Sequence, residues 1–257
     1  MAQRYKVTSE YAADLPVHKY GSGFPLNDTP RNRDEHFNYS TSHFNLNQLY
    51  KSPASLFKMT DQNEERISGI TVPWVYMGML FSTFCWHVED LWINSINYSH
   101  TGGIKTWYVV PESEREKFDA YVISKTGKRE FLNSITFMLD PLELKEQGIK
   151  VFKAYQHPKE YILTLYNAYH SGFAQGFNVG EAVNVGSAHS LATIVRALKD
   201  REGVKNAKPP VLSLDWLVFN NLGNSGVNPV LVCLVGCRCK GSTNRSWPGS
   251  VFSCRTV

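Results

Sequence analysis

Hydrophobic positions in this 257-residue chain fall mainly into short β-branched and aromatic runs, bounded by glycine, proline and other turn formers. The strands that this pattern predicts cover residues 5–8, 70–72, 74–77, 83–86, 93–99, 105–110, 160–166 and 181–185. Between two of these strands lies a five-residue loop, His100 to Ile104, that contains two glycines. This spacing predicts a hairpin with His100 in its turn.

Helical periodicity is confined to a few segments. Pro111 is expected to open a helix that buries Phe118 and Val122, and Asp140 caps a second helix that Gly148 ends. An apolar stripe at residues 191–198 predicts a third helix, and residues 41–66 are expected to be helical or irregular. Many short strands with few helices predict an all-β core with flanking helices, a jelly-roll or cupin-like double-stranded β-helix, rather than a parallel α/β sheet.

Composition supports a folded core. Hydrophobic residues make up 42% of the chain and aromatic residues 13%, and the net charge is only +4. No signal peptide follows Met1, no apolar run reaches membrane-spanning length, and no nucleic-acid-binding motif is present. We therefore expect a soluble intracellular protein without a membrane partner.

The cysteines concentrate near the C-terminus. They are Cys85 and then Cys233, Cys237, Cys239 and Cys254. A structural zinc site is one interpretation of this cluster, but the paired spacing of a zinc module is missing. We favour an irregular or truncated tail.

Candidate chemistry begins at His87-Val88-Glu89, which follows a long apolar run. In a strand, residues two apart lie on one face about 7 Å apart, so His87 and Glu89 can bind one metal ion. An imidazole and a carboxylate, completed by a second histidine, make the facial triad of non-haem Fe(II) oxygenases. The alternative is a buried, hydrogen-bonded polar pair.

His170 is the best third ligand. It is expected just past the end of the strand at 160–166, beside a glycine-bearing turn. The other histidines lie among polar or turn residues, before a proline or at a helix start: His18, His36, His43, His100, His157 and His189. We therefore predict a metal site of His87, Glu89 and His170.

Several blocks of sequence resemble the JmjC domain family, in the family's order. The blocks lie at residues 84–90, 95–98, 105–111 and 168–173, with two more at 10–14 and 21–25. The last two are most similar to the JmjC demethylases of histone H3 methyl-lysine 4 (the JARID type). The resemblance implies an N-terminal segment (1–40) that contributes to the catalytic core, a JmjC catalytic domain (41–202) and a C-terminal tail (203–257).

The resemblance also implies Fe(II), 2-oxoglutarate as cosubstrate and O₂. Lys105 is expected to pair with the distal carboxylate of 2-oxoglutarate, since a lysine on a face with Trp107 and Val109 needs an anion; an edge-strand lysine that snorkels is the alternative. The further residues that we expect to contact the cosubstrate or the metal site are Tyr11, Phe84, Ser95, Asn97, Trp107 and Asn184. Ser95 and Asn97 share the face of Glu89 if the strand is regular.

Tyr76 is expected to contact the substrate, since aromatic faces attract methylated ammonium groups; plain core packing is the alternative. The resemblance implies decarboxylation of 2-oxoglutarate coupled to hydroxylation of an N-methyl group, which then leaves as formaldehyde. It further implies a methylated histone tail as substrate, chromatin-associated partners and a nuclear location. The alternatives are a JmjC side-chain hydroxylase, a catalytically silent JmjC scaffold, and a cupin-type enzyme that uses zinc or manganese.

Overall fold

The computed structural model describes residues 8–33, 38–58, 67–133, 137–201 and Leu212. The chain divides into two compact units, Met1–Pro209 and Pro210–Val257. Apart from Leu212, all described residues belong to the first unit. The expected strand at residues 5–7 and the four C-terminal cysteines lie outside the described residues. The zinc interpretation therefore stays a sequence-based one.

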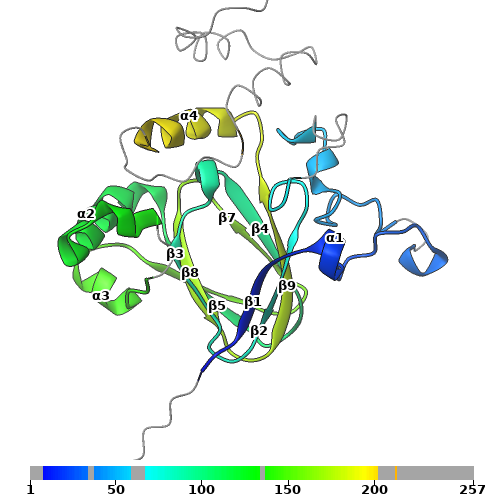
Figure 1. The fold of residues 1–257 in the computed structure, drawn as a ribbon, viewed down its shortest axis with the longest axis horizontal. Helices are drawn as coiled ribbons and strands as arrows, with labels where there is room; N and C mark the ends of the chain where they lie inside the picture. The colour runs from blue at the N-terminus through cyan, green and yellow to red at the C-terminus, as the bar shows by residue number, and fades with distance from the viewer. Residues whose placement is uncertain (1–7, 34–37, 59–66, 134–136, 202–211, 213–257) are drawn as a thin grey trace, which may run out of the picture. The chain divides into compact units, whose positions relative to one another are not determined.

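Nine strands of the described part form two antiparallel sheets, as predicted for a double-stranded β-helix (Figure 1). The five-stranded sheet has the order β1 (Tyr11–Pro16), β2 (Trp74–Gly78), β9 (Asn178–Val185), β4 (Asn94–Gly102), β7 (Tyr161–Thr164). The four-stranded sheet has the order β3 (Thr83–His87), β8 (Tyr169–Ala174), β5 (Lys105–Val110), β6 (Phe152–Gln156). The strands that carry the candidate ligands, β3 and β8, are neighbours.

The helices are α1 (Val17–Tyr20), α2 (Arg115–Thr126), α3 (Pro141–Glu146) and α4 (Ser190–Arg201). Short 3-10 helices are η1 (Pro30–Asn32), η2 (Leu49–Lys51), η4 (Asp90–Trp92), η5 (Glu112–Glu114) and η6 (Arg129–Asn133). The three predicted longer helices are confirmed. The Asp140 side chain accepts a hydrogen bond from Leu142 N at 2.8 Å, as a helix cap should.

One hydrophobic cluster explains which way the ligand strands face. Trp86 on β3 and Tyr169 on β8 are buried against Phe118 of α2 and its neighbours, on the outer face of the four-stranded sheet. Figure 1 shows α2 and α3 on this side. Because side chains alternate along a strand, the next residues, His87 and His170, point to the opposite face, between the two sheets.

Three local predictions were wrong. No hairpin joins residues 93–99 to 105–110, because β4 pairs with β9 and β7 whereas β5 pairs with β8 and β6. The chain instead crosses from one sheet to the other at Gly103 and Ile104, and His100 lies within β4. Residues 70–72 form a turn with a single bridge from Val72 to Ser68. The glycines correctly indicated where the chain changes direction, but they did not indicate with which strands β4 and β5 pair.

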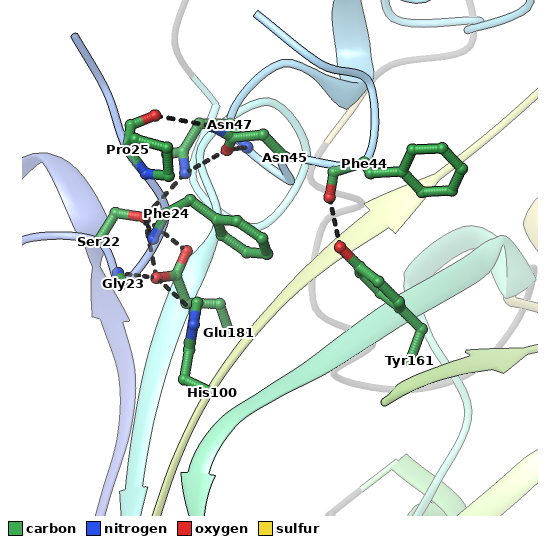
Figure 2. Close-up of polar contacts among 10 residues, drawn as sticks. All are labelled: Ser22, Gly23, Phe24, Pro25, Phe44, Asn45, Asn47, His100, Tyr161 and Glu181. Atoms are coloured by element: carbon green, nitrogen blue, oxygen red, sulfur yellow. Dashed lines mark hydrogen bonds and ion pairs between the residues drawn. The ribbon is translucent and has the colours of Figure 1, made fainter. Parts of the chain in front are cut away.

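The N-terminal segment is fastened to the outer face of the five-stranded sheet by a buried carboxylate (Figure 2). Glu181 of β9, fully buried, accepts hydrogen bonds from Ser22 Oγ at 2.9 Å, from Gly23 N and from His100 Nε2 at 3.0 Å. Asn47 Nδ2 donates to Ser22 Oγ at 2.9 Å, which extends the network into the following loop. Ser22 and Gly23 of the 21–25 block, which resembles a JmjC block, thus have a structural role in this contact.

Candidate metal centre and active site

The two histidines of the predicted triad face each other on paired strands. His87 and His170 are partners in the β3–β8 register, and their ring centroids lie 4.2 Å apart. Glu89 follows β3 in extended backbone and brings Oε1 to 3.4 Å from His170 Nε2. One ligand atom from each of the three residues lies within 4.8 Å of the others. His170 lies inside β8, not past a strand end as the sequence had indicated, because a new strand begins at Tyr169.

Backbone carbonyls fix which nitrogen of each imidazole faces the centre. His87 Nδ1 lies 2.7 Å from the Cys85 carbonyl oxygen, and His170 Nδ1 lies 3.1 Å from that of Ala168. A carbonyl can only accept, so Nδ1 carries the proton and donates in both rings. Each Nε2 of a neutral ring is then left with a lone pair, the form that binds a metal ion.

The charge states suit a divalent cation. Burial, together with the nearby His170, lowers the pKa of His87 to about 4, so its ring is neutral near neutral pH. Burial raises the pKa of Glu89, but the adjacent His170 and His87 rings and the hydrogen bond with Ser95 outweigh it and bring the value to about 2. Two imidazoles and one carboxylate form the donor set of the Fe(II) facial triad. The residues present therefore fit the metal that the sequence predicted.

Asn184 and Ser95 orient the carboxylate ligand. Asn184 Nδ2 donates to Glu89 Oε2 at 2.9 Å, which leaves Oε1 for the metal side. Ser95 also hydrogen-bonds Glu89, and its Oγ lies 2.6 Å from Thr164 Oγ1. The regular strand that was expected from Glu89 to Ser95 is absent, because η4 and its left-handed Leu91 interrupt it.

Lys105 projects its ammonium group into a buried position near Asn97. Only 4% of the residue is exposed, and burial lowers its pKa to about 8. Among the described residues no carboxylate forms an ion pair with it. A Cβ at Gly180 of β9 would lie 2.8 Å from Lys105 Nζ and 3.7 Å from Asn97 Oδ1, so this glycine leaves the ammonium its space. A buried cation without a counter-charge is a suitable anchor for an anionic ligand.

Gln156 links two of the predicted pocket residues. Its Nε2 donates to Asn97 Oδ1 at 3.1 Å, and its Oε1 accepts from Trp107 Nε1 at 3.0 Å. The Trp107 ring stacks toward His170 at 6.1 Å between centroids and contacts Phe84 at 4.6 Å. Phe84 and Trp107 thus form an aromatic wall beside the metal triad, and the buried Gln156 keeps it and Asn97 in place.

Tyr76, Tyr11 and Asp14 form a second, anionic side of the site. The Tyr76 hydroxyl donates to Asp14 Oδ1 at 2.9 Å, and the two tyrosine rings stack at 6.1 Å. Burial and the nearby Asp14 carboxylate raise the pKa of both tyrosines, so both hydroxyls stay neutral.

Ser95 and Asn184 contact Glu89, Trp107 contacts His170 and Phe84, and Gln156 connects Trp107 with Asn97. Lys105 lies near Asn97, and Tyr11 stacks on Tyr76, which donates to Asp14. Sequence reasoning missed Asp14 and Gln156. Asp14 sits in a β-bulge of β1 with φ of 56°, so its direction does not follow from strand alternation. Gln156 ends β6 just before a turn, and no sequence signal separates it from a surface glutamine.

The fold and the donor set place the chain in one class of proteins, the double-stranded β-helix proteins with a metal site of two histidines and one carboxylate. The family model of the JmjC domain, a hydroxylase, matches residues 74–185, and the chain contains this domain. The chain is 39% identical over 191 residues to lysine-specific demethylase 5D of Homo sapiens, which covers 72% of this chain and 12% of that protein. It is 39% identical over 180 residues to lysine-specific demethylase JMJ703 of Oryza sativa, which covers 68% of this chain and 14% of that protein.

The chain thus spans 12% to 14% of the length of these two relatives. Within the described residues, no helix has both the length and the apolar character needed to cross a membrane.

Proposed function

We propose that this chain is the catalytic part of an Fe(II)- and 2-oxoglutarate-dependent lysine demethylase. The observation that carries the proposal is the complete donor set of His87, Glu89 and His170, together with a buried ammonium group at Lys105 that pairs with no carboxylate of the described residues. A metal triad alone fits many oxygenases. A triad with an anion anchor in the same pocket fits an enzyme whose cosubstrate is a dicarboxylate.

When bound, the iron supplies the activation of O₂ that is coupled to the decarboxylation of 2-oxoglutarate. The protein's own residues divide the remaining tasks. Lys105 binds the distal carboxylate, and Asn97 lies beside it with its amide oxygen held by Gln156. Trp107 and Phe84 exclude water from the metal side. Tyr11 stacks on Tyr76.

The substrate side of the pocket favours a methylated lysine. Asp14 provides a negative charge and Tyr76 an aromatic ring, the two features that attract an alkylated ammonium group. Hydroxylation of an N-methyl group needs no lone pair on nitrogen, so trimethyl-lysine is an allowed substrate. We infer histone H3 lysine 4 as the site, from the similarity of the 10–14 and 21–25 blocks to demethylases of that residue, and with it a nuclear location and chromatin-associated partners.

The proposal is tested by incubating the protein with Fe(II), ascorbate, 2-oxoglutarate and a panel of methylated histone peptides. Mass spectrometry should show loss of one methyl group from a lysine-4 peptide, with formaldehyde released in equal amount. His87→Ala should abolish both. A product that gains one oxygen and keeps its methyl groups would make the protein a side-chain hydroxylase. Consumption of neither peptide nor 2-oxoglutarate would favour a silent scaffold.

Tyr76→Ala separates substrate binding from cosubstrate turnover. Because the Tyr76 hydroxyl donates to Asp14, the carboxylate that we expect to attract the alkylated ammonium group, its loss should reduce peptide demethylation more than peptide-independent decarboxylation of 2-oxoglutarate. Equal loss of both activities would place Tyr76 in the metal and cosubstrate machinery instead.

A further inference from the structure

A single guanidinium group, that of Arg115 at the start of α2, contacts both chain segments that carry metal ligands. Its Cζ lies 4.1 Å from the ring centroid of Trp92, three residues after Glu89. It also lies 5.2 Å from the ring centroid of Tyr169, the residue before His170. The side chain is only 12% exposed. Arg115 supplies no ligand, yet it packs against the chain beside two of them.

Both segments have backbone conformations that side-chain-bearing residues rarely adopt. Leu91, Trp92 and Asn167 have φ of 55°, 54° and 55°, in the left-handed region. Such a residue is strained, and it persists only where its surroundings hold it. These bends turn the chain from Glu89 into β4 and from β7 into His170, so the position of each ligand depends on them.

Arg115 and Asn167 connect the two bends. Asn167 N donates to the Trp92 carbonyl oxygen at 3.0 Å, which joins the segments directly. Arg115 Nη1 donates to Asn167 Oδ1, and Asn167 Nδ2 donates to Glu112 Oε1 at 3.2 Å. Asn167 is 2% exposed, so these bonds form away from water. The flat face of the Arg115 guanidinium thus packs on the Trp92 ring at the first bend, and its Nη1 donates to Asn167 at the second.

Two carboxylates fix the direction of the guanidinium. Arg115 Nε lies 3.4 Å from Asp119 Oδ2, one turn further along α2, and Nη2 lies 3.9 Å from Asp200 Oδ2 of α4. A planar group held at its edge in this way can present a flat face to an aromatic ring, which the compact ammonium of lysine cannot.

We propose that Arg115 is a positioning residue that holds the Glu89 and His170 segments in register and thereby sets the affinity of the metal site. The inference rests on the proposed function only for the premise that the triad binds a divalent metal ion. It requires no particular substrate.

Titration of the metal-free protein with Co(II), followed by its visible absorption, tests the proposal without turnover. Arg115→Gln should weaken Co(II) binding about 10-fold or more, the usual effect of losing a residue that orients ligands. Arg115→Lys keeps the charge for Asp119 and Asp200 but loses the flat face. It should recover most of the thermal stability without recovering the affinity.

Arg129→Gln is the matched control. Arg129 also pairs with Asp200, at 2.7 Å, and its contacts among the described residues include neither ligand segment. It should bind Co(II) as the wild type does. Wild-type affinity in folded Arg115→Gln, or in Arg115→Lys, would overturn the proposal, and so would an equal loss in the Arg129 control.

A second variant covers the case in which Arg115→Gln does not fold. Trp92→Leu removes the aromatic face and leaves the ion pairs of Arg115 intact, so it should also weaken Co(II) binding. Unchanged affinity in that variant would again overturn the proposal. If the wild type itself bound no Co(II), or if His87→Ala bound it equally well, the proposed function would fail instead.

Discussion

The Lys105 ammonium is the clearest energetic anomaly among the described residues. It is buried, and burial lowers its pKa to about 8, near the pH at which the protein would work. A lysine is costly in such a place unless an anion joins it. The bound dicarboxylate would supply that anion, so cosubstrate affinity should depend on the protonation of this one group.

We expect the apparent affinity for 2-oxoglutarate to fall as pH rises through about 8. Below its pKa the Lys105 amine is charged and pairs with the distal carboxylate; above it the amine is neutral and the pairing is lost. Measurement of KM for 2-oxoglutarate between neutral and alkaline pH checks this. Lys105→Met should bind roughly 100-fold more weakly or worse, with a flat profile, because loss of one partner of a buried charge pair costs about 3 to 5 kcal/mol. An unchanged KM in the variant would contradict the assignment.

Asn184 is expected to act through Glu89. Its amide donates to Glu89 Oε2, so Asn184→Ala frees the carboxylate to rotate and should weaken Co(II) binding about 10-fold. Asn178→Ala is a control on the same strand, because Asn178 of β9 donates instead to the Gly176 carbonyl oxygen at 3.0 Å. Equal affinity in the two variants would show that Asn184 has no special role at the metal centre.

Individual site residues could be predicted from the sequence where their residue type is unusual for its surroundings. His87 and Glu89 stand two residues apart at the end of an apolar run, and Lys105 stands inside another apolar run. Both patterns are unusual. Asp14, Gln156 and Arg115 could not be recognised in this way, because aspartate, glutamine and arginine are common residues on protein surfaces. Only their contacts with Tyr76, Asn97 and Trp92 give them a role, and those contacts depend on packing between distant segments.

Among the elements, hydrophobic pattern predicted the existence of most strands and all three longer helices, but not their partners. The wrong hairpin illustrates the reason. A glycine-bearing loop between two strands is compatible with a turn or with a crossing between sheets, and the choice depends on whether β4 gains more from pairing with β9 or with β5. The register of β4 on β9 involves contacts far apart in sequence, which local pattern does not contain.

The attachment of the N-terminal segment gives a prediction at the scale of elements. A Cβ at Gly23 would lie 2.6 Å from the His100 ring, so Gly23→Ala should push the segment off Glu181 and destabilise the protein by about 1 to 3 kcal/mol. Thermal unfolding measures the loss. Gly176→Ala is the control, because its Cβ would meet only an ordinary contact at 3.7 Å. A Gly23→Ala variant as stable as that control would show that the segment tolerates displacement.

For the whole molecule, the metal ion should act as a connection between strands as well as a reaction centre. The triad joins β3 to β8, which are paired in space but distant in sequence, and the unfolded chain lacks this arrangement. Binding only the folded state at a free metal concentration 100 times Kd stabilises it by about 2.7 kcal/mol. We expect Co(II) to raise the melting temperature of the wild type and not of His87→Ala. Equal shifts in both would point to metal bound elsewhere.

The crossing from β4 to β5 has a consequence for how this chain can vary in length. Gly102 has φ of 98°, and a Cβ there would lie 2.1 Å from the Phe177 carbonyl oxygen. Gly103 N donates to that same oxygen at 2.6 Å, and Gln175 N donates to the Ile104 carbonyl oxygen at 2.8 Å. Inserting a residue here would shift Lys105 by one position along β5 and turn its side chain to the opposite face of the sheet. Surface loops in general tolerate insertions, but this short connection should keep a fixed number of residues wherever the lysine has to reach the pocket.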